Sequence, residues 1–289
     1  MIVLGCFLAL DLILVGLLFV PPIQEKVVGV VAETLSEKWN SRITIGHIYL
    51  SPTLKLTVED LVIRDHHDNS MIAAGKLKSR FTTLKFSPFK LGFSDIESDK
   101  IKVNIRKYKG DDAVNISIWA KNFKKKKKNP NPFEMKASSI ILKNAYFIYH
   151  NDLTCSTKDK GDIDFGYFEL KNIDARLDNF LLLGSNISAD IEHLAFQQYT
   201  GFVLNNLCGK FHIGPDGLTL HNATLATPNS RVFLDFAFEY GSWQDYSDFL
   251  NKIKFNVKAK TSTFDMKDIR YFAPKTAGMD NRLYPSLSA

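Results

Sequence analysis

The chain has 289 residues, of which 45% are hydrophobic and 24% are charged. This composition provides enough apolar side chain for a sizeable core and excludes wholesale disorder. The net charge is +6, but five consecutive lysines supply most of it, and without them it would be +1. A nucleic-acid-binding function inferred from bulk charge is therefore excluded. The aromatic content of 12%, dominated by 22 Phe, favours strands and apolar surfaces.

The N-terminal segment Ile2–Val20 is apolar, with Asp11 as its one charged residue. At about 1.5 Å per residue, a helix of this length nearly spans a hydrocarbon core of roughly 30 Å. A cleaved signal peptide would need basic residues before the apolar run and a small-x-small cleavage site after it. Neither is present, so residues 1–22 are predicted to be an uncleaved transmembrane signal anchor.

Asp11 is the candidate polar site within the predicted membrane segment. A carboxylate at mid-membrane costs roughly 2.5–3.5 kcal/mol on insertion scales, which marks it as a functional candidate. The alternative is that the surrounding Leu and Phe residues carry the insertion and Asp11 is merely tolerated. Basic residues occur only on the C-terminal side of the segment, so charge alone would place the body of the protein in the cytoplasm.

Residues 23–40 have helical periodicity and are predicted to form an amphipathic helix that ends near Trp39 and caps the region that follows. Charged residues occupy the face opposite the apolar one, and Pro21-Pro22 suits the first turn. The apolar face comprises Ile23, Val27, Val30, Val31, Leu35 and Trp39.

Residues 41–289 contain one repeated pattern: apolar, x, apolar, x, Asn or Asp, apolar, x, apolar. Any one copy is weak evidence, because apolar alternation is common, but repetition at this density indicates a repeated structural unit. A near match occupies residues 202–209. The five full copies are residues 56–63, 140–147, 168–175, 218–225 and 264–271.

The spacing within each copy predicts a bulge at its Asn or Asp. Alternate residues of a strand point to the same face, so the two apolar pairs, an odd number of steps apart, would face opposite ways. One extra bulged residue restores a common face, and Asn and Asp tolerate the backbone conformation that a bulge demands. For the fifth copy, a turn into a short helix fits equally well.

The predicted fold is mainly β: a long, curved antiparallel sheet with short helical inserts at Trp243–Leu250 and near Phe264–Phe272. A sheet with one strongly apolar face must cover it by closing on itself, by helices or by lipid. The chain has too little helix left to cover such a sheet. A curved, partly open trough is the solution that remains.

Two adjacent segments of alternating apolar residues, 218–225 and 232–238, are predicted to line this groove. The tight connection Thr227–Arg231 makes the segments antiparallel neighbours, so that both apolar sets face the same side. The candidate lining residues are Leu218, Leu220, Ala223, Leu225, Val232, Leu234, Phe236 and Phe238.

Residues 123–132 form a Lys-rich and Pro-containing segment that is predicted to be a flexible loop. One interpretation is contact with anionic lipid headgroups, worth about 1 kcal/mol per basic residue near the membrane surface. The other, which we favour, is that the lysines prevent aggregation between strand edges. The candidate headgroup contacts are Lys124, Lys125, Lys126, Lys127 and Lys128.

The sequence carries no recognisable catalytic or phosphate-binding motif, and we predict neither an enzyme nor a cofactor. Asp65-His66-His67-Asp68 is its densest polar cluster. As neighbours in a strand, the two histidines would point to opposite faces, so a solvated hairpin turn is favoured over a metal site. Cys155 and Cys208 could pair in an oxidising compartment, although free thiols are favoured.

Six segments carry a resemblance to a known family: Ile43–Ile48, Gln198–Phe211, Gly217–Ala223, Thr227–Arg231, Asp248–Phe255 and Asp268–Pro274. In this order they resemble the N-terminal portion of TamB-like proteins of the AsmA-like superfamily, in the version found in Bacteroidetes-type bacteria. The resemblance covers essentially the whole chain. Two features depart from the family: the basic flank before the anchor and the partner-binding C-terminal domain are absent. We therefore expect a fragment.

The resemblance implies a single-pass bacterial inner-membrane protein with its body in the periplasm. It implies a β-groove in cell-envelope biogenesis that conducts phospholipids between the inner and outer membranes, with acyl chains as its ligands. An alternative is a translocation and assembly factor for outer-membrane β-barrel proteins, acting with an Omp85-family partner through a C-terminal region absent here. A passive structural tether is the third possibility.

Overall fold

The structure, a computed structural model, describes residues 28–121, 132–154, 166–241 and 254–272, together with Asp164 and with gaps at 31, 38–39, 52, 54, 87–88, 165 and 216. Several predictions fall outside these residues. They are the anchor at residues 1–22 with Asp11, the lysines of the 123–132 loop, the helical insert at Trp243–Leu250 and the pairing of Cys155. Cys208 carries a free thiol.

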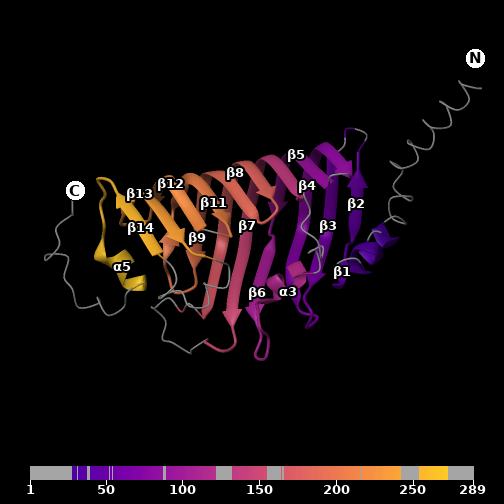
Figure 1. The fold of residues 1–289 in the computed structure, drawn as a ribbon, viewed down its shortest axis with the longest axis horizontal. Coiled ribbons are helices and arrows are strands. Elements are labelled where there is room, and N and C mark those ends of the chain that lie inside the picture. Colours follow the sequence, from indigo (N-terminus) through magenta and orange to yellow (C-terminus); the bar gives the residue numbers. More distant parts are fainter. Residues whose placement is uncertain are drawn as a thin grey trace, which may run out of the picture.

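The described residues form one large mixed sheet of 14 strands, which confirms the mainly β class. Figure 1 shows the strands arching over along one long side, so that the sheet forms a trough. Its main path runs β1-β3-β4-β5-β7-β8-β9-β11-β12-β13-β14, while β2 pairs with β3, β10 with β9, and β6 with both β4 and β7.

The strands are β1 (Ile43–Thr44), β2 (His47–Leu50), β3 (Lys55–Arg64), β4 (Ser70–Phe86), β5 (Phe89–Asp99), β6 (Lys102–Lys107), β7 (Glu134–Asn151), β8 (Tyr167–Leu183), β9 (Asn186–Gln198), β10 (Val203–Leu204), β11 (Asn206–Gly214), β12 (Gly217–Ala226), β13 (Arg231–Glu239) and β14 (Lys254–Ala259). The helices α3 (Asn115–Lys121) and α5 (Met266–Phe272) follow β6 and β14.

The prediction of a purely antiparallel sheet is wrong at one place, because β5 and β6 both run parallel to β7. Parallel neighbours need a long crossover connection rather than a hairpin. Residues 108–133, which include α3, make that connection between β6 and β7. The alternation of apolar residues does not indicate whether a strand pairs in a parallel or an antiparallel direction. The sequence therefore did not predict this parallel crossover.

The amphipathic segment is helical at residues 28–30 and 32–37. The helix closes at Asn40, where φ is 44°, and the amide of Ser41 donates to the carbonyl of Ser36 (3.1 Å). Leu35 packs against a buried cluster of Ile43, Ile63 and Met71. These helical residues thus lie against the β1 end of the sheet. Val30, predicted to lie on the apolar face, is instead 64% exposed, while Val28 is buried. None of the helices in the described ranges is long and apolar enough to cross a membrane.

The predicted bulges occur at the Asn residues of three repeats. Asn144, Asn172 and Asn222 have φ values of 51°, 50° and 50° within otherwise extended strands. At each of them the pairing with a neighbouring strand slips by one residue. The apolar pairs on either side therefore share a face, as the spacing requires.

The first and fifth copies behave differently. Asp60 also has a left-handed backbone, with φ 53°, but β3 keeps one register with β4 on both sides of it. The predicted extra residue is therefore wrong there. The fifth copy, residues 264–271, leads into α5, so the alternative of a turn into a short helix is the one that the structure has. Asp268 in α5 is buried and accepts hydrogen bonds from the hydroxyls of Thr227 and Ser230 (2.5 Å each), which fixes α5 to the β12–β13 turn.

Residues with left-handed backbone lie in one row across the sheet, with Gly75 between two of them. Asp60 falls opposite Gly75, and Gly75 falls opposite Lys100, which has φ 58° and separates β5 from β6. The amide of Lys100 in turn donates to the carbonyl of Lys143, next to Asn144 (2.8 Å). We call this row the crease.

The crease continues near the other end of the sheet. Gly209 of β11 has φ 148° and packs directly against β12 beside Asn222. A Cβ on Gly209 would lie 3.0 Å from Cα of Ala223 and 3.1 Å from the carbonyl oxygen of His221, so only glycine fits there. The trough is therefore a consequence of local backbone conformation repeated from strand to strand.

Replacing Asn222 with valine tests the crease. A β-branched residue is disfavoured at φ 50°, so Asn222→Val should lower the free energy of unfolding by about 1–2 kcal/mol. Asn222→Gly should change the free energy of unfolding little, because glycine adopts positive φ without a steric penalty. Both variants keep the backbone amide of residue 222, which donates to Asp235 Oδ1 (2.7 Å). Urea unfolding of the full chain in non-ionic detergent measures both.

The matched control is Lys210→Val, at an exposed position on the neighbouring strand β11. Valine there should be tolerated, because β-branched residues suit extended backbone. Equal destabilisation by valine and glycine at position 222 would show that the left-handed conformation is not what shapes the strand.

Candidate functional site: the apolar trough

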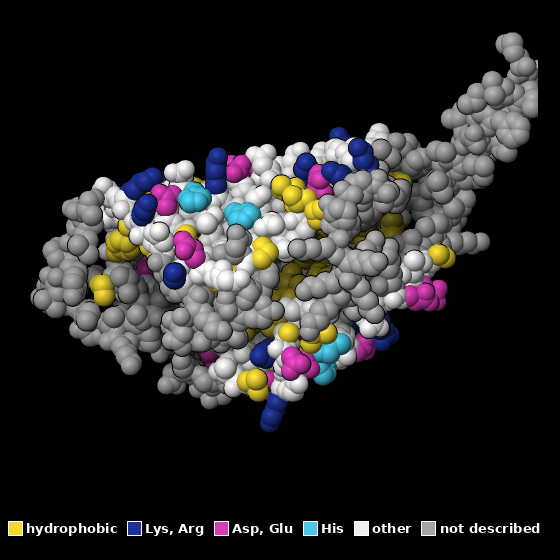
Figure 2. Space-filling model, viewed as in Figure 1, with side chains coloured by type: hydrophobic (Ala, Val, Ile, Leu, Met, Phe, Trp, Pro, Cys, Tyr) yellow, Lys and Arg dark blue, Asp and Glu magenta, His cyan; other side chains and the backbone are white. Residues whose placement is uncertain are grey.

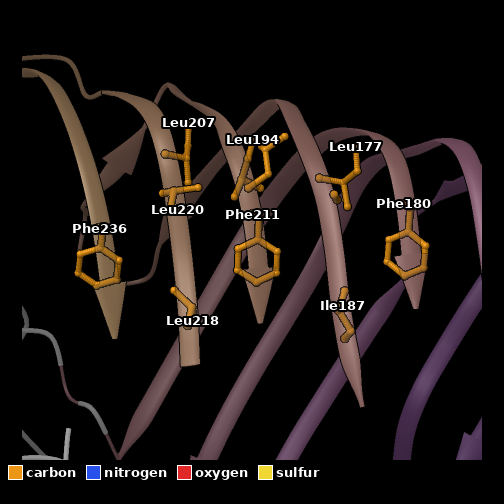
Figure 3. A pocket seen from close by; sticks show the side chains of 11 residues that line it. Leu177, Phe180, Ile187, Leu194, Leu207, Phe211, Leu218, Leu220 and Phe236 are labelled. Atoms are coloured by element: carbon orange, nitrogen blue, oxygen red, sulfur yellow. The ribbon is translucent and has the colours of Figure 1, made fainter. Parts of the chain in front are cut away.

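An open apolar pocket of about 340 Å³ lies along the inside of the trough, between β8 and β13. Its lining residues lie on β8, β9, β11, β12 and β13, which are neighbours along the main path of the sheet. Figure 3 shows how the labelled side chains lie on these strands. All of its lining side chains are hydrocarbon: Leu177, Phe180, Ile187, Ala189, Ile191, Leu194, Leu207, Phe211, Leu218, Leu220 and Phe236.

Strand register explains why so many apolar side chains share this face. Leu218 and Leu220 lie opposite Phe238 and Phe236, and the bulge at Asn222 then brings Ala223 and Leu225 to the same face. Their partners on β13 are Leu234 and Val232. The eight residues singled out from the sequence are therefore four directly opposed cross-strand pairs.

These eight residues differ in depth. Leu218, Leu220 and Phe236 line the pocket. Ala223 and Val232 are buried, with 2% and 6% of their surface exposed. Leu225, Leu234 and Phe238 are half-buried on the same face, and the ring of Phe238 contacts that of Phe236 with centroids 4.2 Å apart.

Sequence reasoning missed most of the pocket, although a signal was present. Residues 175–182 form a sixth copy of the repeat, and Asn179 at its centre has φ 53°. The pairing of β8 with β9 slips by one residue there, which keeps Leu177 and Phe180 on one face. Leu207 belongs to the near match at residues 202–209, and Phe211 follows just after it. Between them Gly209 has φ 148°, and the pairing of β11 with β12 slips by one residue there.

The pocket is not a filled core. Nine of its eleven lining residues are half-buried rather than buried, the exceptions being Ala189 and Ile191. In Figure 2 hydrophobic side chains are visible within the hollow of the molecule, while charged side chains gather around it. A dry β-core would instead show closely packed, solvent-free side chains.

The opposite face of the same strands is polar. Asp235 alternates with the pocket residues of β13, accepts the amide of Asn222 and lies 3.7 Å from Nδ1 of His221. The hydrogen bond from that amide holds the pKa of Asp235 below its usual value. Charge is thus kept on the outside of the trough, and hydrocarbon on the inside.

A second, polar cluster lies at the β3–β4 hairpin. The carboxylate of Asp65 is buried and accepts hydrogen bonds from Tyr108 Oη (2.7 Å) and Asn115 Nδ2 (3.0 Å). Burial acts to raise the pKa of Asp65, but these hydrogen bonds outweigh it and hold the pKa below its usual value. Burial, followed by the bond to Asp65, raises the pKa of Tyr108 to about 12.

Residues 66–69 form the predicted hairpin turn, but its histidines do not point apart. Nε2 of His66 and Nε2 of His67 lie 2.7 Å and 3.4 Å from one oxygen of Asp111. The expectation of opposite faces assumed an extended strand, whereas these residues sit in a turn. The argument against a shared ligand position therefore does not apply.

Comparisons with known proteins add no assignment. No protein-family model matches the chain, and no curated protein matches it either. The resemblance to TamB-like proteins rests on the sequence segments alone and stays a prediction.

Enlarging Ala189 tests whether the pocket is open. Ala189 lines the pocket and lies opposite Phe211, so Ala189→Phe should place its ring in the free volume. We expect the free energy of unfolding to fall by less than about 1 kcal/mol. Overpacking a filled core typically costs about 1–3 kcal/mol.

Ala74→Phe is the matched control, because Ala74 is 1% exposed and does not line the pocket. It should show the full overpacking cost in the same chemical denaturation experiment. If both variants lost the same stability, the apolar trough would be a packed core.

Proposed function

We propose that the trough holds phospholipid acyl chains and conducts phospholipids between two membranes of the bacterial cell envelope. The observation that carries the proposal is the open pocket lined only by hydrocarbon side chains. Exposed apolar surface costs roughly 25 cal/mol per Å² in water, so a lining of this kind favours an apolar occupant.

The form of the trough suits a chain-like ligand. Its lining comes from successive strands, so apolar side chains follow one another along the length of the sheet rather than around a closed chamber. An acyl chain can lie along such a surface while its headgroup stays in water. No polar side chain in the lining would select one acyl chain over another, which fits a bulk lipid substrate.

The location is what the resemblance to TamB-like proteins implies, and it belongs to the same proposal. The apolar segment at residues 1–22 would anchor the chain in the inner membrane, and the body would lie in the periplasm. The helical residues 28–30 and 32–37 lie at the β1 end of the sheet, where Leu35 packs against its buried cluster, and β14 lies at the other end of the main path. Lipid would then pass along the trough, away from the anchored end.

Assembly of outer-membrane β-barrel proteins is the second candidate function. It is favoured by β14, which has a neighbour on one side only among the described strands and exposes 54% of Val257. A strand edge of this kind can template pairing with another chain. The proposed partner in that case is an Omp85-family protein.

Phe236→Asp distinguishes a lipid trough from a packed core. In an open trough the new carboxylate stays hydrated, so the thermal midpoint should change little while acyl-chain binding is lost. In a dry core an unpaired buried charge would cost more than about 4 kcal/mol. The measurements are thermal unfolding and photo-crosslinking to a phospholipid with a diazirine in its acyl chain.

The control is Ala237→Asp, which places the same charge on the other face of the same strand. Crosslinking should persist in this variant, and crosslinked peptides should map to the pocket strands. Absence of crosslinking in the wild type, together with collapse of the Phe236→Asp variant, would replace the lipid proposal with a passive tether. Capture of an outer-membrane barrel without lipid would favour the assembly function.

A further inference from the structure

We propose that His66, His67 and Asp111 form a binding site for a divalent transition-metal ion, with Zn²⁺ as the metal to test. The site is distinct from the apolar trough. Their three ligand atoms, one from each side chain, all lie within 4.8 Å of one another. The two histidines come from the turn between β3 and β4, and Asp111 comes from the loop between β6 and α3.

The spacing is that of a ligand set. Zn²⁺ binds imidazole nitrogen and carboxylate oxygen at about 2.0–2.2 Å, which places tetrahedral ligands about 3.4 Å apart. His67 Nε2 and Asp111 Oδ2 are already 3.4 Å apart. His66 Nε2 is closer to the same oxygen, at 2.7 Å, which is a hydrogen-bond distance. A small rotation of the carboxylate would open that distance.

An ordinary ion pair accounts for only part of this arrangement. One histidine beside Asp111 is enough for an ion pair, but the Nε2 of a second imidazole lies 3.4 Å from the same oxygen. The two rings are 4.4 Å apart between centroids, so both nitrogens and the carboxylate oxygen surround one small space in which a single ion could contact all three.

The surrounding contacts hold the ligands in place. Asp65, immediately before the histidines, accepts the amides of His67 and Asn69 (3.0 Å each) and so fixes the turn. It also accepts the hydroxyl of Tyr108, whose carbonyl receives the amide of Asp111 (3.1 Å). Tyr108 therefore ties the loop that carries Asp111 to the turn that carries the histidines. Supporting contacts of this kind orient metal ligands in proteins.

The donor set indicates the class of metal. Two imidazoles and one carboxylate suit Zn²⁺ and similar divalent ions, whereas Mg²⁺ and Ca²⁺ prefer oxygen ligands throughout. The side chain of His67 is 44% exposed, which leaves room for water in a fourth position. A bound ion would clamp the β3–β4 hairpin to the crossover loop between β6 and β7.

The test is a Zn²⁺ titration of the untagged full chain in non-ionic detergent, with a chromophoric chelator as competitor. We expect one Zn²⁺ per chain and a Zn²⁺-dependent rise in the thermal midpoint. His67→Gln and Asp111→Asn should each weaken binding by at least about tenfold, since even supporting residues outside the ligand set contribute that much at metal sites. His66→Gln/His67→Gln should abolish stoichiometric binding.

The matched control is His221→Gln, which removes a histidine lying 3.7 Å from a single carboxylate, that of Asp235, with no second histidine. Binding should be unchanged in this variant. Thermal midpoints without metal show whether each variant folds, and the exposed His67 provides a test even if Asp111→Asn lowers stability. Zn²⁺ binding that is substoichiometric, or equal in the wild type and the His67→Gln and Asp111→Asn variants, would overturn the proposal and leave an ordinary ion pair.

Discussion

Left-handed backbone conformation at single residues within strands is the constraint on which this fold depends. A strand of L-residues resists positive φ, and Asn, Asp and Gly pay the smallest penalty for it. Asn144, Asn172 and Asn222 each supply one such residue near the middle of a strand. Because the turns of neighbouring strands align, the sheet bends along a line instead of twisting open. The hollow and its two chemically different faces both follow from that bend.

The extra residue at each bulge also decides the chemistry of the trough. Without it, Leu218 and Leu220 would face one side of the sheet and Ala223 and Leu225 the other. Half of the apolar side chains would then lie on the outer surface, beside Asp235 and His221. The same Asn therefore bends the strand and keeps hydrocarbon on one side of it. A binding surface for acyl chains needs both effects at once.

The repeat made the bent strands and the shared apolar face predictable from the sequence, because both depend on local spacing. The pocket was less predictable. Phe211 lies just beyond the near match at residues 202–209, and Leu177 belongs to a copy that overlaps the preceding repeat. Asp60 shows the opposite failure: the pattern is complete and φ is positive, yet β3 keeps its register with β4 and no residue is added. Register depends on the partner strand, which one strand's sequence does not encode.

The parallel pairing of β6 with β7 links the least predictable features of the molecule. A hairpin after β6 would have kept the sheet antiparallel and taken the chain directly into the next strand. The crossover instead carries Tyr108, Asp111 and Asn115 across to the β3–β4 turn, where they meet Asp65 and the histidines. These groups are more than 40 residues apart in sequence, so no motif spacing could reveal them. The parallel crossover between β6 and β7 thus creates a polar cluster that the repeated bulged strands alone would not produce. The trough arises from regularity in the chain, and the histidine cluster arises where that regularity is interrupted.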